Sequence, residues 1–137
     1  QDSLVVGAVL SRIKKAFNKG NDPAVISVGN IDTERDFIAV EDVVDAYLIM
    51  MRSNCWGDVF NVCSGKPYSI RRILQLLADN SKRKIEFLED ASLIRSTDVK
   101  RVYGSSEKSR KILGFTPKIS LASALTAAWN EAVGGGA

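Results

Sequence analysis

The sequence predicts an α/β fold: a small, mostly parallel sheet with flanking helices. Two observations predict this class. Short, β-branched apolar runs alternate with longer segments of helical periodicity, and the connections between them are short. The composition is that of a globular domain, with 45% apolar and 26% charged residues among 137. Because we find no internal repeat or interior linker, we expect one domain over residues 1–133 and a flexible tail at 134–137.

The first half of the chain is expected to hold two helices and three strands. Apolar residues recur at positions 5, 9, 13 and 17, which predicts an amphipathic helix that ends at the turn around Gly20. Residues 24–28 predict a buried strand, residues 36–40 a shorter extended piece, and residues 59–63 another buried strand. Between them, Glu41 and Asp42 suit the first turn of a helix. Its apolar side chains should face inward: Val43, Val44, Tyr47, Leu48 and Met51.

The second half predicts three more helices and one strand. Ser69 is a good N-cap for a helix that begins at Ile70, and residues 84–88 alternate like a strand with one wetter face. A polar loop follows over residues 90–104. A short helix over residues 106–113 should stop at Gly114, and Ser120 should cap the last helix. Trp129 on that helix, like Trp56, is expected to pack inside; the alternative for Trp129 is a surface that another part of the protein covers.

Composition and charge exclude several classes of protein. No run approaches the roughly 20 apolar residues that cross a bilayer, and no basic stretch precedes the apolar run at 4–10, so we expect a cytoplasmic protein without membrane contact. The 19 basic and 16 acidic side chains are scattered and leave a net charge of only +3, which gives nucleic-acid binding little support. There is no histidine, and Cys55 and Cys63 are expected to be buried structural thiols, so no metal site is predicted.

The motifs of independent catalysis are also missing. No G-x-G-x-x-G lies between a strand and a helix, so this chain offers no dinucleotide-binding turn. Tyr68 is followed four residues later by Arg72, not by the lysine of a Tyr-x-x-x-Lys pair, and an arginine stays protonated. We therefore predict no catalytic residue and no cofactor-binding residue in this chain.

Three pieces of sequence belong together: residues 28–44, residues 60–70 and residues 95–99. In this order they resemble the second half of the extended short-chain dehydrogenases, the NAD(P)-dependent epimerases, dehydratases and reductases of sugar nucleotides. The resemblance is strongest to GDP-mannose 4,6-dehydratase and GDP-4-dehydro-6-deoxymannose reductase, and it runs from about Gln1 to Trp129. It implies the C-terminal subdomain of an extended Rossmann-type enzyme without its Rossmann core. NAD(P) is then expected in the complete enzyme but not on this chain.

The resemblance also implies a set of substrate-binding residues. Arg35 and Arg95 match arginines that reach the substrate diphosphate, and a guanidinium offers phosphate oxygens a planar fork of donors. Asp98 matches the acid that binds ribose hydroxyls, since a carboxylate can accept two hydrogen bonds from a diol. Val28 and Asn30 fall where the family passes its backbone beside the nucleotide. The alternatives are that Arg35 pairs with a neighbouring carboxylate, Glu34 or Asp36, and that Arg95 and Asp98 lie on a solvated loop.

Two functions remain open at this point. The first is a nucleotide-sugar-binding domain, preferring a GDP-sugar and inactive alone. The second is a free-standing, non-catalytic domain that uses the face left by the missing cofactor domain for protein contacts, including self-association. A nucleic-acid binder has only the slight positive charge in its favour.

Overall fold

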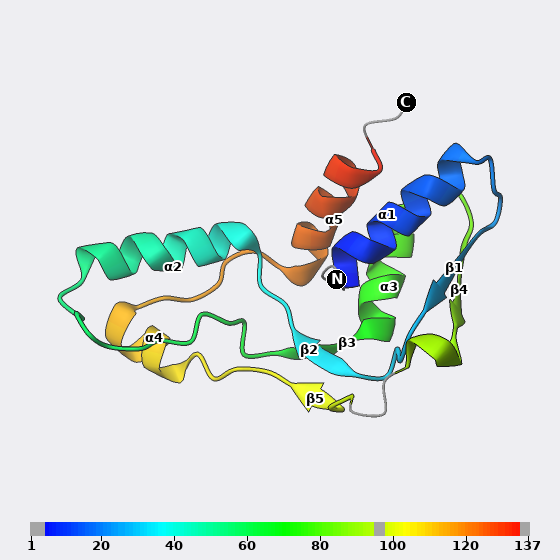
Figure 1. Cartoon of the computed structure of the whole chain (residues 1–137). Coiled ribbons are helices and arrows are strands. Elements are labelled where there is room, and N and C mark those ends of the chain that lie inside the picture. The colour runs from blue at the N-terminus through cyan, green and yellow to red at the C-terminus, as the bar shows by residue number, and fades with distance from the viewer. Residues whose placement is uncertain (1–4, 95–97, 135–137) are drawn as a thin grey trace.

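The computed structural model describes residues 5–94 and 98–134. Helices and strands alternate along the chain as expected for the α/β class (Figure 1). The helices are α1 (Val5–Asn18), α2 (Val40–Arg52), α3 (Ile70–Ala78), α4 (Glu107–Leu113) and α5 (Leu121–Ala132), with a short 3₁₀ turn, η1, at Ala91–Leu93. The strands are β1 (Ala24–Val28), β2 (Glu34–Asp36), β3 (Pro67–Ser69), β4 (Ile85–Glu89) and β5 (Arg101–Val102). Beyond Gly134, the predicted tail lies outside the described residues.

The strands form two small sheets where the sequence predicted one. β1 pairs with β4 in parallel, in a register that runs from Ala24 opposite Ile85 to Val28 opposite Glu89. In the second sheet the order is β3-β2-β5, with β2 antiparallel to β3 and parallel to β5. Two of these three pairings are parallel, so the predicted class of a small, mostly parallel sheet with flanking helices is confirmed.

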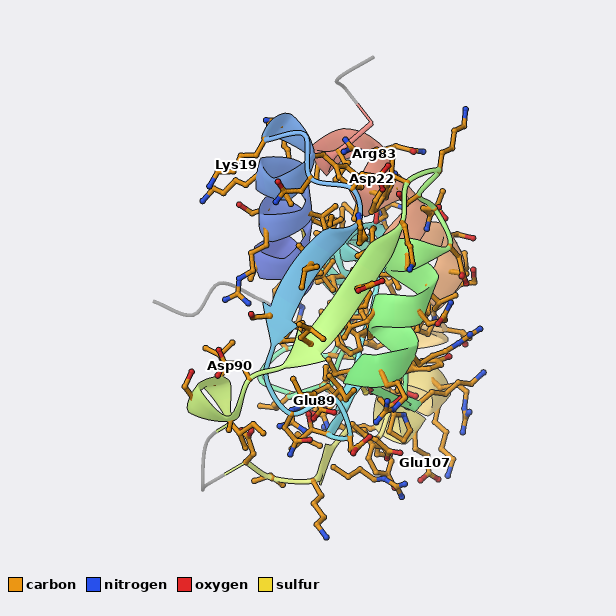
Figure 2. All side chains as sticks on the ribbon, turned by 90° about the vertical axis from the view of Figure 1, so that its right-hand side faces the viewer. Lys19, Asp22, Arg83, Glu89, Asp90 and Glu107 are labelled. Carbon is orange, nitrogen blue, oxygen red and sulfur yellow. The ribbon has the colours of Figure 1, made fainter. Side chains whose placement is uncertain are left out.

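The main hydrophobic core lies between the β1–β4 sheet and three helices, α1, α3 and α5. Ile13, Ile73 and Leu77 are fully buried there. Full burial of a side chain of this size stabilises the fold by roughly 1.5–3 kcal/mol. Trp129 closes the far side of the core, its ring edge-to-face with Phe17 at a centroid distance of 6.5 Å. Figure 2 shows β1 and β4 side by side, flanked by α1 and α3.

The predicted helix boundaries are confirmed where the sequence carried a cap. The Ser69 side chain accepts a hydrogen bond from the backbone of Arg72, and Ser120 caps α5 in the same way. Gly114 ends α4 with a φ of 67°, the left-handed conformation that glycine adopts without strain.

The prediction that the apolar side chains of α2 face inward is wrong. Its buried residues are Asp42 and Ala46, whereas the predicted apolar set is exposed or half-buried, and Met51 is 73% exposed. These side chains are not buried, because α2 lies away from the main core. Figure 1 places α2 with α4, apart from α1, α3 and α5, and no residue of α2 belongs to the main core. The apolar face of α2 consequently has no cover within the described residues.

Other apolar segments on this side of the molecule also differ from expectation. Residues 59–63 form no strand: Val59 is 81% exposed and only Cys63 is buried. Trp56 is 82% exposed instead of packed inside. The extended piece predicted at 36–40 forms earlier, as β2, because its strand partners β3 and β5 lie beside residues 34–36. An apolar run becomes a buried strand only where a neighbour pairs with it.

Asp42 holds α2 to the segment before α5, and its removal should destabilise the chain. Its carboxylate is 2% exposed and accepts hydrogen bonds from the backbone of Lys118 (2.9 Å) and Ile119 (3.1 Å). Asp42→Ala would leave these two donors unpaired, so we expect a loss of about 2–3 kcal/mol in the free energy of unfolding, measured by urea denaturation. The control is Asp45→Ala, which removes only an exposed ion pair with the Lys118 ammonium and should cost less than about 1 kcal/mol. Equal effects of the two changes would contradict this role.

Candidate functional site

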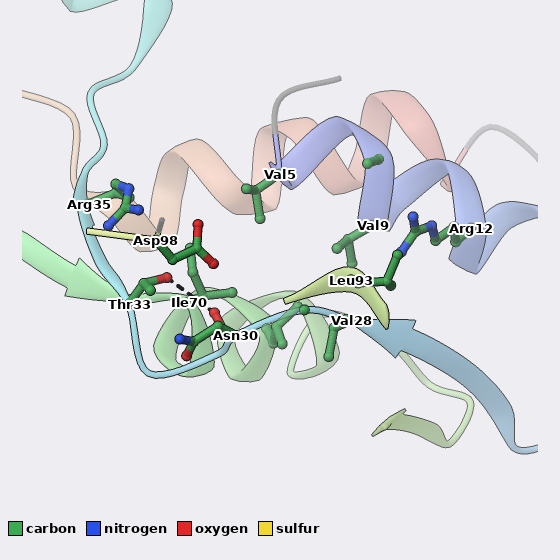
Figure 3. A pocket seen from close by; sticks show the side chains of 13 residues that line it. Val5, Val9, Arg12, Val28, Asn30, Thr33, Arg35, Ile70, Leu93 and Asp98 are labelled. Carbon is green, nitrogen blue, oxygen red and sulfur yellow. Dashed lines mark hydrogen bonds between the residues drawn. The ribbon is translucent and has the colours of Figure 1, made fainter. Parts of the chain in front are cut away.

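A pocket of about 380 Å³ opens at the carboxyl end of β1 (Figure 3). Ligand sites in α/β proteins commonly lie at this end of the strands. The pocket is walled by α1, by the loop from β1 to β2, by the start of α3 and by η1. Its lining residues are Val5, Ala8, Val9, Arg12, Val28, Gly29, Asn30, Thr33, Arg35, Ile70, Leu74, Leu93 and Asp98.

One face of α1 forms a wall of the pocket. Positions 5, 8, 9 and 12 are spaced three and four residues apart, so they share one stripe of the helix. The first three are apolar, and Arg12 follows one turn after Ala8. The stripe therefore presents an apolar surface that ends in a single cation.

The loop after β1 is held by its own polar groups. The Asn30 side chain accepts a hydrogen bond from the backbone of Asp32 (3.0 Å), and the buried Thr33 hydroxyl donates to the Asn30 carbonyl (3.1 Å). The start of α3 then donates to the loop, from the Ile70 N–H to the Thr33 carbonyl at 3.0 Å. These bonds fix Val28 and Asn30 at the pocket, where the sequence predicted a contact with substrate.

Gly29 lets the loop pass close to η1. A Cβ atom at this position would lie 2.9 Å from the Leu93 carbonyl oxygen, closer than real Cβ atoms approach backbone. Gly29 is absent from the glycines of positive φ in the structure, so close approach, and not a left-handed conformation, explains the glycine. This contact sets the separation of the two walls that carry Val28 and Leu93.

Arg35 lies at one end of the pocket on the central strand of the second sheet (Figure 3). Its Nη1 donates to the backbone carbonyls of Glu34 and Val99, both at 2.8 Å. Neither predicted carboxylate pairs with it: Glu34 binds Arg101, whose pKa this hydrogen bond raises, and Asp36 accepts from Ser64 and Gly65. Among the described residues, the guanidinium is thus held by two backbone carbonyls and by no carboxylate, so its charge is available to a ligand.

Asp98 lies beside Arg35 in the same pocket and is half-buried (Figure 3). The Arg35 hydrogen bond to Val99, the next residue, holds this part of the chain in place. Arg95, the second predicted diphosphate ligand, lies outside the described residues. The structure therefore brings four of the five predicted residues to one pocket: Val28, Asn30, Arg35 and Asp98.

Asp36 has a structural role next to the site. Its carboxylate accepts hydrogen bonds from the Ser64 backbone and hydroxyl and from the Gly65 N–H, at 2.6–2.9 Å. Cys63 is buried beside it, and both burial and the Asp36 charge raise the pKa of this thiol. Cys63 is thus buried as the sequence predicts, whereas Cys55, for which burial was also predicted, is only half-buried.

The chemistry of the pocket is that of binding. A cation and a carboxylate at one end can hold an anion and a diol, and the apolar walls can enclose a flat or aliphatic group. Over residues 5–94 and 98–134, no cluster of three or more His, Cys, Asp or Glu side chains could hold a metal ion. In the same ranges, no helix is long and apolar enough to cross a membrane.

Comparison with known proteins places this architecture. The family model described as GDP-mannose 4,6 dehydratase matches residues 3–127, nearly the whole chain. The chain belongs to this family. GDP-6-deoxy-D-mannose reductase from Pseudomonas aeruginosa is 34% identical over 127 residues, which cover 93% of this chain and 41% of the reductase. GDP-6-deoxy-D-talose 4-dehydrogenase from Aggregatibacter actinomycetemcomitans is 32% identical, covering 80% of this chain and 36% of the dehydrogenase.

Solved structures agree with the fold. RMD from Pseudomonas aeruginosa, solved with NADPH, superposes with a TM-score of 0.84 at 32% identity and covers 98% of this chain and 44% of its own. UDP-glucose 4-epimerase from Thermotoga maritima, solved with UDP-glucose, has a TM-score of 0.79 at 22% identity and covers 96% of this chain and 40% of its own, which shows the shared fold alone. The chain spans about two fifths of the length of the relatives it matches.

Several pocket residues were not predicted from the sequence. Thr33 and Leu93 come to the pocket through the loop geometry and η1, for which the sequence offered no signal. Arg12 did carry one. Its spacing from Val5 and Val9 places it on the same stripe of the helix, although the sequence alone assigned it no role.

Two glycine-to-alanine substitutions should have opposite effects on stability, because an added Cβ atom meets backbone at Gly29 and open space at Gly7. Gly29→Ala would drive a Cβ into the Leu93 carbonyl and force the pocket walls apart, so we expect a loss of about 1–3 kcal/mol in unfolding free energy. Gly7→Ala is the control. A Cβ there meets nothing within 4 Å, and alanine favours the helix, so a gain of about 0.5–1 kcal/mol is expected. Urea denaturation measures both; a neutral Gly29→Ala would show that the walls move freely.

Proposed function

We propose that this chain is the sugar-nucleotide-binding portion of an NAD(P)-dependent dehydratase, reductase or epimerase, with a GDP-sugar as the preferred ligand. One observation carries the proposal: Arg35 and Asp98 lie together at one end of a pocket at the carboxyl end of β1, with apolar side chains between them and the other end. Family membership and the GDP-sugar names of two relatives support the choice of ligand.

Arg35 binds the diphosphate in this proposal. Its two backbone hydrogen bonds use Nη1, so Nη2 and Nε remain to donate to phosphate oxygens. Because these bonds already fix the side chain, little conformational freedom is lost when a ligand binds. Asp98 accepts from the ribose hydroxyls, and Arg95 contributes a second cation to the diphosphate.

The hydride chemistry belongs to a cofactor that this chain does not bind by itself. NAD(P) needs a glycine-rich turn between a strand and a helix. Here the turn after β1 has the single glycine Gly29, which leads into a loop and not into a helix. The residues present do not fit the cofactor, so we assign this chain to substrate binding and expect no turnover from it alone.

Loss of Arg35 or Asp98 should weaken nucleotide binding. Hydrogen bonds to charged groups contribute about 1.5–3 kcal/mol, so Arg35→Gln is expected to lower the affinity for GDP-mannose about tenfold or more, and Asp98→Asn somewhat less. Isothermal titration calorimetry at millimolar ligand measures this, because half of a site binds weakly. Arg110→Gln, an exposed change on α4 outside the pocket, is the control and should leave the affinity unchanged. No binding by the wild-type chain, or equal affinity in the Arg35 variant, would contradict the proposal.

A second function, protein contact, is favoured by the exposed face of α2. Val44, Tyr47, Leu48 and Met51 lie on this helix between 43% and 73% exposed, and Trp56 and Val59, in the segment after the helix, are exposed as well. Exposed patches of this kind mark interaction sites. We propose that this face packs against a polypeptide corresponding to the part of the relatives that has no counterpart here, and that in its absence two copies pair through it.

Charge placed on this face should abolish self-association. We expect the wild-type chain to form dimers at high micromolar concentration in sedimentation-equilibrium runs, and Tyr47→Glu with Met51→Glu to be monomeric, because burying the two carboxylates is costly. Leu88→Glu, on the outer face of β4 and 55% exposed, is the control that should still dimerise. A wild-type chain that stays monomeric throughout would argue against a contact through α2.

A further inference from the structure

Arg12 lies at the opposite end of the pocket from Arg35 and Asp98 (Figure 3). It occupies α1 one turn after Ala8 and beside Leu93 of η1. Its Nη1 donates to the Ser27 carbonyl at 2.7 Å, which ties the side chain to β1. This is a second fixed cation in the pocket, and the binding of diphosphate and ribose at the Arg35 end does not use it.

The Ser27 hydrogen bond leaves most of the guanidinium available. An arginine has five N–H donors, and Nη1 supplies one of them to Ser27. Within the described residues, Arg12 forms no ion pair with a carboxylate. A guanidinium held by one backbone carbonyl at the edge of a pocket is suited to a ligand that presents paired acceptors.

The space between the two ends suits a flat group. Apolar side chains from α1, β1 and η1 face it: Val5, Val9, Val28 and Leu93. If the diphosphate and ribose occupy the end with Arg35 and Asp98, the base extends along these walls. Its edge then reaches Arg12.

We propose that Arg12 binds the edge of the base and selects guanine. The inference rests on the nucleotide-binding function proposed above. Guanine presents two acceptors side by side, O6 and N7, which match two donors of one guanidinium. Adenine places an amino donor beside N7, which repels the guanidinium, and uracil offers O4 alone. Arg12 is thus a specificity-determining residue, separate from the residues that hold the diphosphate.

The test compares ligands that differ in one acceptor. Calorimetry with GDP, 7-deaza-GDP and UDP is carried out on the wild-type chain, on Arg12→Gln and on Arg12→Lys. 7-Deaza-GDP lacks N7 and keeps the diphosphate, ribose and O6. We expect wild type to prefer GDP over 7-deaza-GDP and over UDP, each by about tenfold. Arg12→Gln should bind all three ligands alike, and Arg12→Lys, whose ammonium can still donate to O6 and N7, should retain part of the preference for GDP.

Lys14→Gln is the matched control, because it removes the same charge from α1 outside the pocket. It should retain the full preference for GDP. Arg12 would have no role in base selection if the wild-type chain bound GDP and 7-deaza-GDP equally, or if Arg12→Gln weakened all three ligands by the same factor, as for a phosphate contact. Either result leaves the nucleotide-binding proposal intact, whereas a wild-type chain that binds none of the ligands overturns both.

Discussion

Two backbone hydrogen bonds at the start of α3 connect the hydrophobic core to the pocket. The Ile70 N–H donates to the Thr33 carbonyl at 3.0 Å, and the Arg71 N–H donates to the Ile31 carbonyl at 2.8 Å. The first N–H groups of a helix have no partner within the helix, so the loop after β1 supplies acceptors that α3 requires. Ile31 and Ile70 are themselves part of the core. A shift of this loop would therefore expose apolar surface and also leave the first N–H groups of α3 without acceptors. This double cost holds the side chains at the pocket in place.

The sequence predicted the elements whose burial and ends are decided locally. The amphipathic stripes of α1, α3 and α5 match the three helices that cover the main core, and Ser69 and Ser120 mark helix starts by a side-chain bond to a residue three positions later. The candidate site was predicted differently. Arg35 and Asp98 came from a resemblance across three distant pieces of sequence, and the fold places both at one pocket. Leu93 and Thr33 could not be predicted, because only tertiary packing brings η1 and the loop together.

The predictions failed where burial depends on a neighbour. The pattern of α2 correctly shows which of its faces is apolar, but a pattern says nothing of what covers that face. In the structure, Asp42 lies on the buried side, where its carboxylate accepts from the backbone of Lys118 and Ile119. A carboxylate in the first turn of a helix is ordinarily explained by its favourable interaction with the dipole of that helix. Here the carboxylate also binds the backbone of a segment that is distant in the sequence. Val59 is exposed for the same reason: the strand predicted around it finds no neighbouring strand among the described residues.

The size and charge of the pocket bear on where chemistry would occur. A cavity of about 380 Å³ is at the small end of the range for ligand sites, roughly 300–1,000 Å³. In the proposed binding mode, the end with Arg12 takes a base, and the end with Arg35 and Asp98 takes a ribose and the start of a diphosphate. A sugar on the far phosphate would then extend past Arg35, beyond the walls that this chain provides. The reacting carbons of the sugar would lie outside the pocket, so binding and chemistry would fall to different parts of a complete enzyme. In the proposed binding mode, this chain would hold the nucleotide, and another part of the enzyme would act on the sugar.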